Sequence, residues 1–428
     1  MKNRWNTLLA ALSAAMTFSS LSHATALPVP LDGQKTSMWC WAASGQMIMN
    51  YLGATGVQQC KEANLELGRT DCCDVQTPAA CVKGGHTQFT EYHFDYQTSP
   101  QMSFQAIQYE IDHGRPIEFA WNWDGGGGHV MVAIGYKIVG NVNYVTINNP
   151  IPVGMGATYD LTYAAWVSGA GYTHQVDYFN IADHPVCSSD FNGMPAGSFQ
   201  ACFDYQALHG RYPVTLSAYQ TSGGIKMAGS FQPGSSRPVR TLMTSAQFQS
   251  YFNTYASQGY RPDQVTVVPT ASGPLFTALW TPVDGAFTTQ YGMTDAGFQT
   301  TFNQMASAGY LLADLYAYPD GVTRYVATWV KKASNGYYAY TNMTSADYSA
   351  HFNQLAALGF RPTRFNAFTT PAGIRYAAVW QKLSGGFYMF YAMTPSSYQS
   401  TYNTLSAQGY RLNELTGLDD VLAAVWTQ

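Results

Sequence analysis

Charged side chains are scarce in this sequence. Asp, Glu, Lys and Arg make up 11% of its 428 residues, well below the roughly 25% of an average soluble domain. The formal net charge is -4, which excludes the strongly basic surface of a nucleic-acid-binding protein. We therefore expect no nucleic-acid partner. The chain is longer than one ordinary domain needs, and with 46% hydrophobic residues it can bury a sizeable core.

Long apolar runs are also rare. The stretch from Leu8 to Phe18 is mostly apolar, but it is too short to span a bilayer as a stable helix. It follows a short basic head and precedes small residues that end at Ala24, which is the pattern of a signal peptide over residues 1–24. No cysteine lies near the cleavage site, so we expect a secreted protein, extracellular or periplasmic, without a membrane anchor.

Cysteines are few, and their number is odd. Seven are present, so an oxidising compartment leaves at least one thiol unpaired or bonded to another chain. Two lie close together after position 185, and four form a cluster that allows three pairings, of which a bond between adjacent residues is the strained one. The pair is Cys187 and Cys202; the cluster is Cys60, Cys72, Cys73 and Cys81. Cys40 is left over.

The second half of the chain repeats itself every 50 residues. Similar phrases begin at Met243, Met293, Met343 and Met393, and a degenerate copy begins at Met194. Each copy predicts a strand, a helix and two further strands. No single unit can bury its own apolar face, so the units must pack on one another. We predict five repeats from residue 185 to 428, arranged as a ring or propeller, at about 185–231, 232–280, 281–330, 331–380 and 381–428.

Each of the four clear copies carries signals for the two ends of its helix. Threonines such as Thr244 stand where an N-cap is expected, and Gln247 follows at the position of a capping box. Phe248, Phe252 and Tyr255 recur at helical spacing and predict one apolar face. A glycine ends each helix, as a left-handed C-terminal cap would. The recurring tryptophans of the strands, Trp280, Trp329, Trp380 and Trp426, are expected in the core.

The first half, residues 25–184, has no such period. A helix is predicted from Cys40 to Leu52, and strands over Pro116–Trp121, Val130–Tyr136 and Tyr144–Ile147. The predicted fold is therefore α+β, with an N-terminal helix followed by an antiparallel sheet.

Four residues of this half could form a thiol-nucleophile site. Cys40 opens an apolar helix, whose positive end favours the thiolate and should lower the thiol pKa. Gln34, six residues upstream, could join the Cys40 backbone N–H as an oxyanion donor. His129 follows the glycine run 125–128, expected to form a wall open to substrate, and begins an apolar strand. Asn149 ends the next predicted strand, where its amide oxygen could orient the imidazole.

These residues resemble the papain-like cysteine peptidases, in particular the AvrRpt2-type (C70) group. The motifs that carry the resemblance are Val29-Pro30, Gln34, Trp39-Cys40-Trp41-Ala42-Ala43, Gly127-Gly128-His129 and Asn148-Asn149-Pro150, within residues 27–170. Asn149 departs from the Asp of many relatives, so either Asn148 or Asn149 could be the orienting residue. The resemblance implies a papain-like catalytic domain with catalytic Cys40, His129, Asn149 and Gln34, acting on proteins or peptides through an acyl-thioester. The repeats resemble bacterial tandem repeats related to those of polyglycine hydrolases.

Other interpretations remain for each feature. Cys40 could be structural, His129 a core residue, Gln34 a loop residue and Asn149 a turn residue. A peptidoglycan amidase or endopeptidase also uses Cys then His, and a binding protein with a degenerate peptidase domain is a third class. We expect His86, His93 and His113 at the surface, no cofactor and no metal site. For the repeats we expect a role in binding or regulation, with a cell-surface, polysaccharide or protein ligand.

Overall fold

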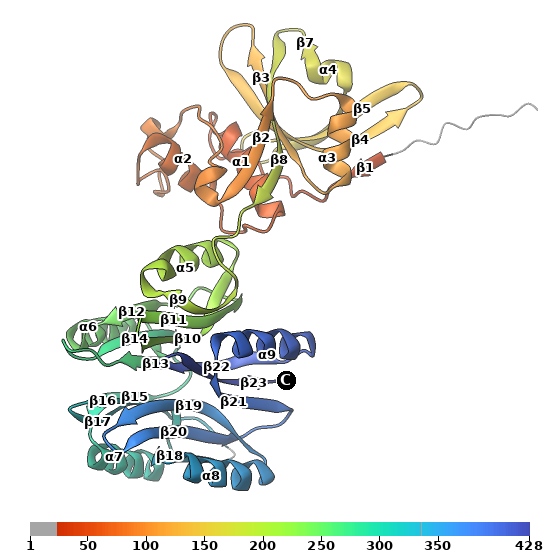
Figure 1. Ribbon diagram of the computed structural model, residues 1–428. Helices are drawn as coiled ribbons and strands as arrows, with labels where there is room; N and C mark the ends of the chain where they lie inside the picture. The colour runs from red at the N-terminus through yellow and green to blue at the C-terminus, as the bar shows by residue number, and fades with distance from the viewer. Residues whose placement is uncertain (1–23, 335) are drawn as a thin grey trace, which may run out of the picture. The chain divides into compact units, whose positions relative to one another are not determined.

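The computed structural model describes residues 24–334 and 336–428. The chain divides after His184 into two compact units, which are coloured red to yellow and green to blue in Figure 1. The basic head and apolar run of the predicted signal peptide lie outside the described residues. Within the described part, no helix is long and apolar enough to cross a membrane.

The first unit is built on one antiparallel sheet with the strand order β2-β8-β3-β4-β5-β6; β1 pairs with β4, and β7 pairs with β8. The strands are β1 (Ala24–Ala26), β2 (Phe94–Ser99), β3 (Ile117–Trp123), β4 (Gly128–Val139), β5 (Val142–Asn149), β6 (Ala157–Thr162), β7 (Ser168–Gly169) and β8 (Tyr172–Asp183). The helices are α1 (Cys40–Tyr51), α2 (Gln59–Leu67), α3 (Phe104–Asp112) and α4 (Tyr163–Val167), with 3₁₀ turns η1 (Ala79–Cys81) and η2 (Thr90–Tyr92). A helix followed by an antiparallel sheet is the predicted layout.

Strand β4 lies at the centre of this unit. Helices α1 and α3 both pack against it, which explains why its middle is apolar at nearly every position instead of every second one. Met131 and Ala133 belong to the core cluster that includes Phe104 and Ile107 of α3. Val130 packs on the cluster of Trp39 and Trp41. The buried strand thus fixes the start of α1 against the sheet.

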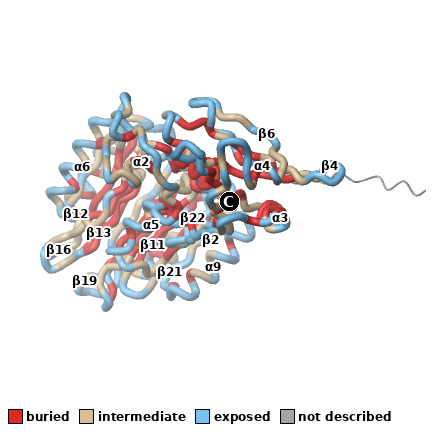
Figure 2. Tube along the Cα trace, turned by 90° about the horizontal axis from the view of Figure 1, so that it is seen from above, coloured by how far each residue is buried: buried red, intermediate tan, exposed pale blue. Residues whose placement is uncertain are grey.

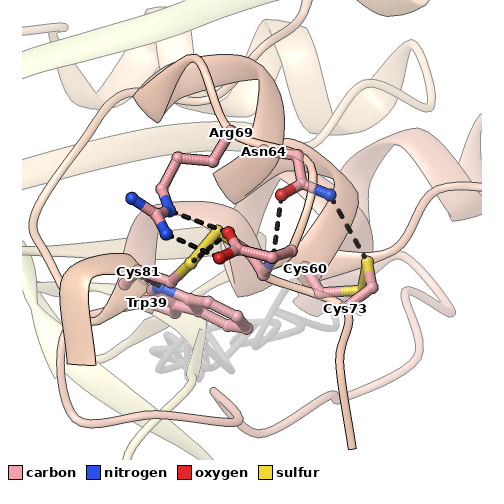
Figure 3. The surroundings of a disulfide bond; sticks show 8 residues. Trp39, Cys60, Asn64, Arg69, Cys73 and Cys81 are labelled. Atoms are coloured by element: carbon pink, nitrogen blue, oxygen red, sulfur yellow. Dashed lines mark hydrogen bonds and ion pairs between the residues drawn. A yellow bond between two sulfur atoms is a disulfide. The ribbon is translucent and has the colours of Figure 1, made fainter. Parts of the chain in front are cut away.

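The structure settles the cysteine pairing that the sequence left open. Cys60 bonds to Cys73 and Cys72 to Cys81, so the adjacent pair is not joined, while Cys187 bonds to Cys202. Cys40 is the free cysteine, as the odd count predicts. Figure 3 shows the Cys60–Cys73 and Cys72–Cys81 bonds, with Asn64 Nδ2 donating to Cys73 Sγ at 3.9 Å and Asn64 Oδ1 accepting from the Cys72 N–H at 2.9 Å.

The second unit consists of five modules, each with the predicted order strand, helix, strand, strand. Each forms a three-stranded antiparallel sheet in which the last strand is central. The first module contains β9 (Asp190–Pro195), η3 (Ala196–Ser198), α5 (Phe199–Leu208), β10 (Arg211–Thr221) and β11 (Gly224–Pro233), and the second contains β12 (Val239–Met243), α6 (Ser245–Ser257), β13 (Tyr260–Val268) and β14 (Leu275–Pro282). The third contains β15 (Phe287–Met293), α7 (Asp295–Ser307), β16 (Leu311–Asp320) and β17 (Val322–Val330), and the fourth contains β18 (Tyr337–Met343), α8 (Ser345–Ala357), β19 (Phe360–Thr370) and β20 (Gly373–Lys382). The fifth contains β21 (Phe387–Met393), α9 (Pro395–Ala407), β22 (Arg411–Leu418) and β23 (Val421–Thr427).

The helix-end signals are confirmed. The Thr244 side chain accepts from the Gln247 N–H and Gln247 reaches back to complete a capping box, and Thr344 and Asp347 form a second one. The glycines that follow α6 to α9 all have φ between 76° and 83°, a conformation that suits a residue without a Cβ. The four recurring tryptophans are fully buried. Figure 2 shows the buried strand interiors in red and the exposed loops in blue.

The modules contact one another through their second strands. β10, β13, β16, β19 and β22 touch in succession, and β22 also touches β10. Tyr219 of the first module shares a core cluster with Trp426 of the fifth, and the Tyr398 hydroxyl donates to Asp190 Oδ1 at 3.1 Å. In Figure 1 the helices α6 to α9 lie on the outside of this unit, with the second strands inside. The last module therefore buries apolar surface against the first.

Candidate active site

Cys40 is the first residue of α1, and its side chain is half-buried. Burial raises the pKa of the thiol, and the carboxyl group of Glu118 adds to this effect, whereas the backbone N–H groups of Val130 and Trp41 lower it. The net direction is upward. The predicted lowering of the pKa by the helix N-terminus is therefore wrong, because desolvation of the thiolate outweighs the backbone N–H groups of Val130, Trp41 and Cys40.

His129 is buried near the start of β4, and its Nε2 lies 2.8 Å from Asn149 Oδ1. The Asn149 amide is oriented by two further bonds, since its Nδ2 donates to the Tyr159 hydroxyl at 2.9 Å and its Oδ1 accepts from the Ile151 N–H at 2.9 Å. An amide oxygen only accepts hydrogen bonds, so the proton of neutral His129 is on Nε2. Nδ1 is then the ring nitrogen that can act as a base.

Asn148 is occupied elsewhere. It is buried, its Nδ2 donates to the Val29 carbonyl at 3.1 Å, and its Oδ1 accepts from the Thr158 hydroxyl at 2.6 Å. Successive strand residues point to opposite faces, so only one of the two asparagines can contact His129. In this structure it is Asn149.

Burial lowers the pKa of His129, and the hydrogen bond with Asn149 acts in the opposite direction. The Trp123 ring stacks beside the imidazole, with 6.2 Å between ring centroids and 16° between planes. The apolar surroundings thus favour the neutral imidazole over the imidazolium.

Gln34 is held by the loop that follows Asn149. Its N–H donates to the Pro150 carbonyl at 2.9 Å, and its own carbonyl accepts from the Gly154 N–H at 2.9 Å. A Cβ on the preceding Gly33 would lie 2.3 Å from the Met155 nitrogen, so only glycine permits this approach. The side chain is buried and its Nε2 donates to the Thr36 carbonyl at 2.8 Å, which leaves a second amide hydrogen for another acceptor.

Three of the four predicted residues meet in one cleft of about 700 Å³. Gln34, Cys40 and His129 line it, and Asn149 contacts His129 without lining it. Gly126 and Gly127, with φ of 90° and 82°, form part of the wall, as expected for the glycine run. His93 and His113 are exposed, as predicted. His86 is exposed too, but it lines the cleft, which the sequence did not indicate.

The sequence interpretation missed Glu118, a buried residue of β3 that also lines the cleft. The Thr87 hydroxyl lies 2.5 Å from Glu118 Oε2 and 2.9 Å from the Trp41 carbonyl. A hydroxyl has one hydrogen, so both contacts are satisfied when protonated Glu118 donates to Thr87 and Thr87 donates to Trp41. Burial raises the pKa of Glu118 to about 8 despite the Thr87 bond, which agrees with this assignment.

A second acid, Glu62 of α2, is fully buried nearby. Burial raises its pKa well above the usual range, and Glu118 adds to the effect. Within the described part of the chain, Glu62 Oε1 has no hydrogen-bond partner, as suits a carboxyl group that is neutral. A glutamate inside the apolar stretch Ile117–Trp121 was the available sequence signal for Glu118.

One group of potential metal ligands comes together in the described part of the chain, namely Asp71, Cys72 and Cys81. The two cysteines are bonded to each other, so neither offers a thiolate. Asp71 is also bound by Arg69 at 2.6 and 2.8 Å (Figure 3). These residues do not fit a metal ion.

Comparison with known families gives two matches. Residues 21–156 match the family described as papain-like cysteine protease AvrRpt2. Residues 192–232, 239–283, 284–332, 334–383 and 384–428 each match the polyglycine hydrolase-like structural repeat, and together these matches span more than half of the chain. Both resemblances seen in the sequence are thereby confirmed. No curated protein matches the chain.

Proposed function

This chain belongs to the family that carries the polyglycine hydrolase-like structural repeat, and we propose that its first unit is a secreted papain-like cysteine endopeptidase. One observation carries the proposal. The free thiol of Cys40 shares a cleft with His129, whose Nε2 is bonded to Asn149. A nucleophile, a base and an orienting group are the parts that thiol-dependent acyl transfer requires.

In the proposed reaction, His129 Nδ1 takes the Cys40 proton as Sγ attacks the substrate carbonyl carbon. The resulting oxyanion accepts hydrogen bonds from the Cys40 N–H and from the free amide hydrogen of Gln34. The imidazolium then gives its proton to the amide nitrogen, the C–N bond breaks, and the acyl group remains on Cys40 as a thioester. His129 next deprotonates a water molecule, which releases the acid and restores the thiol.

The pKa shifts of Cys40 and His129 indicate how the two side chains are protonated before substrate binds. The pKa of Cys40 is raised and that of His129 is lowered, so the resting pair is a neutral thiol and a neutral imidazole. Proton transfer accompanies attack on the substrate instead of preceding it. Neutral Glu118 favours this proton transfer over ionised Glu118, because a carboxylate lining the cleft would repel the thiolate that forms on Cys40.

The test compares the protein with its Cys40→Ala and His129→Ala variants on an unfolded protein substrate, with a thiol-directed epoxide as probe. We expect cleavage and labelling of Cys40 in the parent and neither in the Cys40 variant. His113→Ala, which changes an exposed histidine of the same unit, should retain full activity. Equal digestion by the parent and the Cys40 variant, with no labelled thiol, would falsify the proposal. Release of muropeptides from peptidoglycan with intact protein substrate would show an amidase instead.

We also propose that the five repeats form a closed ring. The contacts of β22 with β10 and of Tyr398 with Asp190 support it, since an open array would leave both surfaces bare. A circular permutant of residues 185–428 joins Gln428 to Pro185 and opens the chain between the second and third modules. It should fold with the same Tm as the unpermuted residues 185–428. Failure of the permutant to fold, while an insertion at the same loop is tolerated, would argue for an open array.

A further inference from the structure

Five polar residues stand at the same position of the five modules. They are Thr215, Gln264, Asp314, Arg364 and Glu414, spaced by 49 or 50 residues. Each lies on the second strand of its module, where neighbouring modules touch. Thr215, Gln264, Asp314 and Glu414 are buried, and Arg364 is partly buried. Polar groups at such positions need hydrogen-bond partners, here from the other modules.

Hydrogen bonds and one ion pair join these positions and their strand neighbours into a circle, hereafter the polar belt. Gln264 Nε2 donates to Thr215 Oγ1 at 3.2 Å, and Asp314 Oδ2 accepts from the N–H of Val265 at 2.8 Å. Arg364 Nε donates to Asp314 Oδ1 at 2.8 Å, and its Nη1 lies 3.5 Å from Glu414 Oε2. The Leu415 N–H donates to Thr215 Oγ1 at 3.2 Å and closes the circle.

A cavity of about 460 Å³ adjoins the polar belt. The residue immediately before each belt position lines it, so all five modules contribute an equivalent wall: Val214, Asp263, Ala313, Thr363 and Asn413. The cavity therefore lies where the five modules meet. Its volume is within the range of small-molecule sites.

The lining of this cavity is basic. It contains five cationic side chains, Arg261, Lys332, Arg361, Arg364 and Arg411, against one acidic side chain, Asp263. Three of the arginines, Arg261, Arg361 and Arg411, occupy the same position in three different modules. Such a concentration of positive charge contrasts with a chain whose formal net charge is -4 and attracts anions into a concave site.

Not all of this charge is balanced by the protein. Arg261 and Lys332 share Asp284, at 2.8 and 3.2 Å. Arg361 is buried; its guanidinium donates to the backbone carbonyls of Leu383, Gly385 and Gly386 and lies over the Phe387 ring, 5.9 Å from the ring centroid. Burial lowers its pKa, as expected where no acid compensates the charge. Arg411 has no acidic partner among the described residues.

We propose that this cavity binds a small ligand through a tetrahedral oxyanion, a phosphate or sulfate group. Guanidinium groups that approach from three modules suit an anion whose oxygens point in several directions, whereas a planar carboxylate offers two. Among the described residues, the lining contains no aromatic side chain, so stacking of a neutral sugar ring does not explain the site. The site is independent of the peptidase chemistry proposed for the first unit.

The test titrates inorganic phosphate and inorganic sulfate into the full-length Cys40→Ala protein at constant ionic strength and follows heat and Tm. We expect saturable binding with one site per chain. Arg411→Gln, which alters an exposed residue and leaves the polar belt intact, should weaken binding about tenfold, as loss of one charge-assisted hydrogen bond predicts. Arg361→Gln should weaken it at least as much. Arg375→Gln, in the same unit but outside the cavity, should bind as the parent does.

Absence of saturable binding, or equal affinity of the Arg411 and Arg375 variants, would overturn the proposal. A further set of titrations uses a sugar phosphate and a sugar sulfate. Tighter binding of either one than of the free anion identifies the anion as part of a larger ligand that fills the cavity. Equal affinity identifies a site for the free anion. Both results support an oxyanion site and distinguish its source.

Discussion

Asn149 Oδ1 accepts a hydrogen bond from His129 Nε2 at 2.8 Å, across adjacent antiparallel strands. This one contact determines which imidazole nitrogen carries the proton and therefore which one is free to act as a base. It also ties the chemistry of the site to the pairing of β4 with β5.

Replacing Asn149 by Ala should lower kcat by about 10²-fold, as misplacement of a catalytic group does. Asn149→Asp should retain much more activity, because its carboxylate still accepts from Nε2. Asn148→Ala serves as the neighbouring control and should lower the Tm by removing the bonds to Val29 and Thr158. Steady-state cleavage of a peptide measures the effect. Similar kcat values for the two alanine variants would contradict the assigned role.

The proposed peptidase activity should persist to a lower pH than an ordinary histidine would allow. Burial lowers the pKa of His129, so the imidazole stays neutral, and able to act as a base, below the usual pKa of about 6.5. As pH falls, kcat/KM should be lost only below that value. An acid limb centred above it would mean that His129 is charged in the resting site.

Alkylation of Cys40 should require alkaline pH. Burial and Glu118 raise the thiol pKa above its ordinary value of 9.0, so the rate with iodoacetamide should rise with pH and have its midpoint above that value. Glu118→Gln removes a negative charge that forms above about pH 8, and it should move the midpoint down. Glu91→Gln, an exposed acid of the same unit, should not move it. A midpoint near pH 5 would indicate a resting thiolate–imidazolium pair and would refute the neutral state.

The Cys72–Cys81 bond should support activity as well as stability. Trp39, the residue before Cys40, donates from Nε1 to the Cys81 carbonyl at 2.7 Å. A double Ser variant of this pair should lose about 2–4 kcal/mol of stability and also peptidase activity. The matched double Ser variant of Cys187 and Cys202 should destabilise the second unit and leave the specific activity unchanged. Calorimetry and peptide cleavage test both, and an equal loss of activity in the two variants would contradict the prediction.

A left-handed residue precedes the recurring methionine in each module, at Gly193, Leu242, Gly292, Asn342 and Ala392. It coincides with a register shift in the sheet, for example between Phe390 and Met393. Non-glycine residues are strained there. Ala392→Gly, an exposed site, should therefore stabilise the protein by about 0.5–1 kcal/mol. Ala350→Gly, in the exposed middle of α8, should destabilise it by about 1 kcal/mol. Urea unfolding compares the two, and destabilisation by both would show no strain at Ala392.

By itself, the sequence determined the features that depend on short-range patterns. The 50-residue period, the threonine caps and the glycine stops place the helices α6 to α9, because a helix end depends on groups within four residues of it. The odd cysteine count singled out Cys40. The ordered motifs around Gln34, Cys40, His129 and Asn149 indicated the peptidase family before any contact was known.

Only the tertiary structure decided what depends on burial and on residues brought together from distant parts of the chain. It placed Asn149, and not Asn148, in contact with His129, paired the four clustered cysteines and reversed the expected pKa direction of Cys40. It also revealed Glu118 and brought five equivalent strand positions together in the polar belt. The physical reason is the same in each case: desolvation and hydrogen-bond partnership arise from packing between segments, and local periodicity carries no information about which segments will meet.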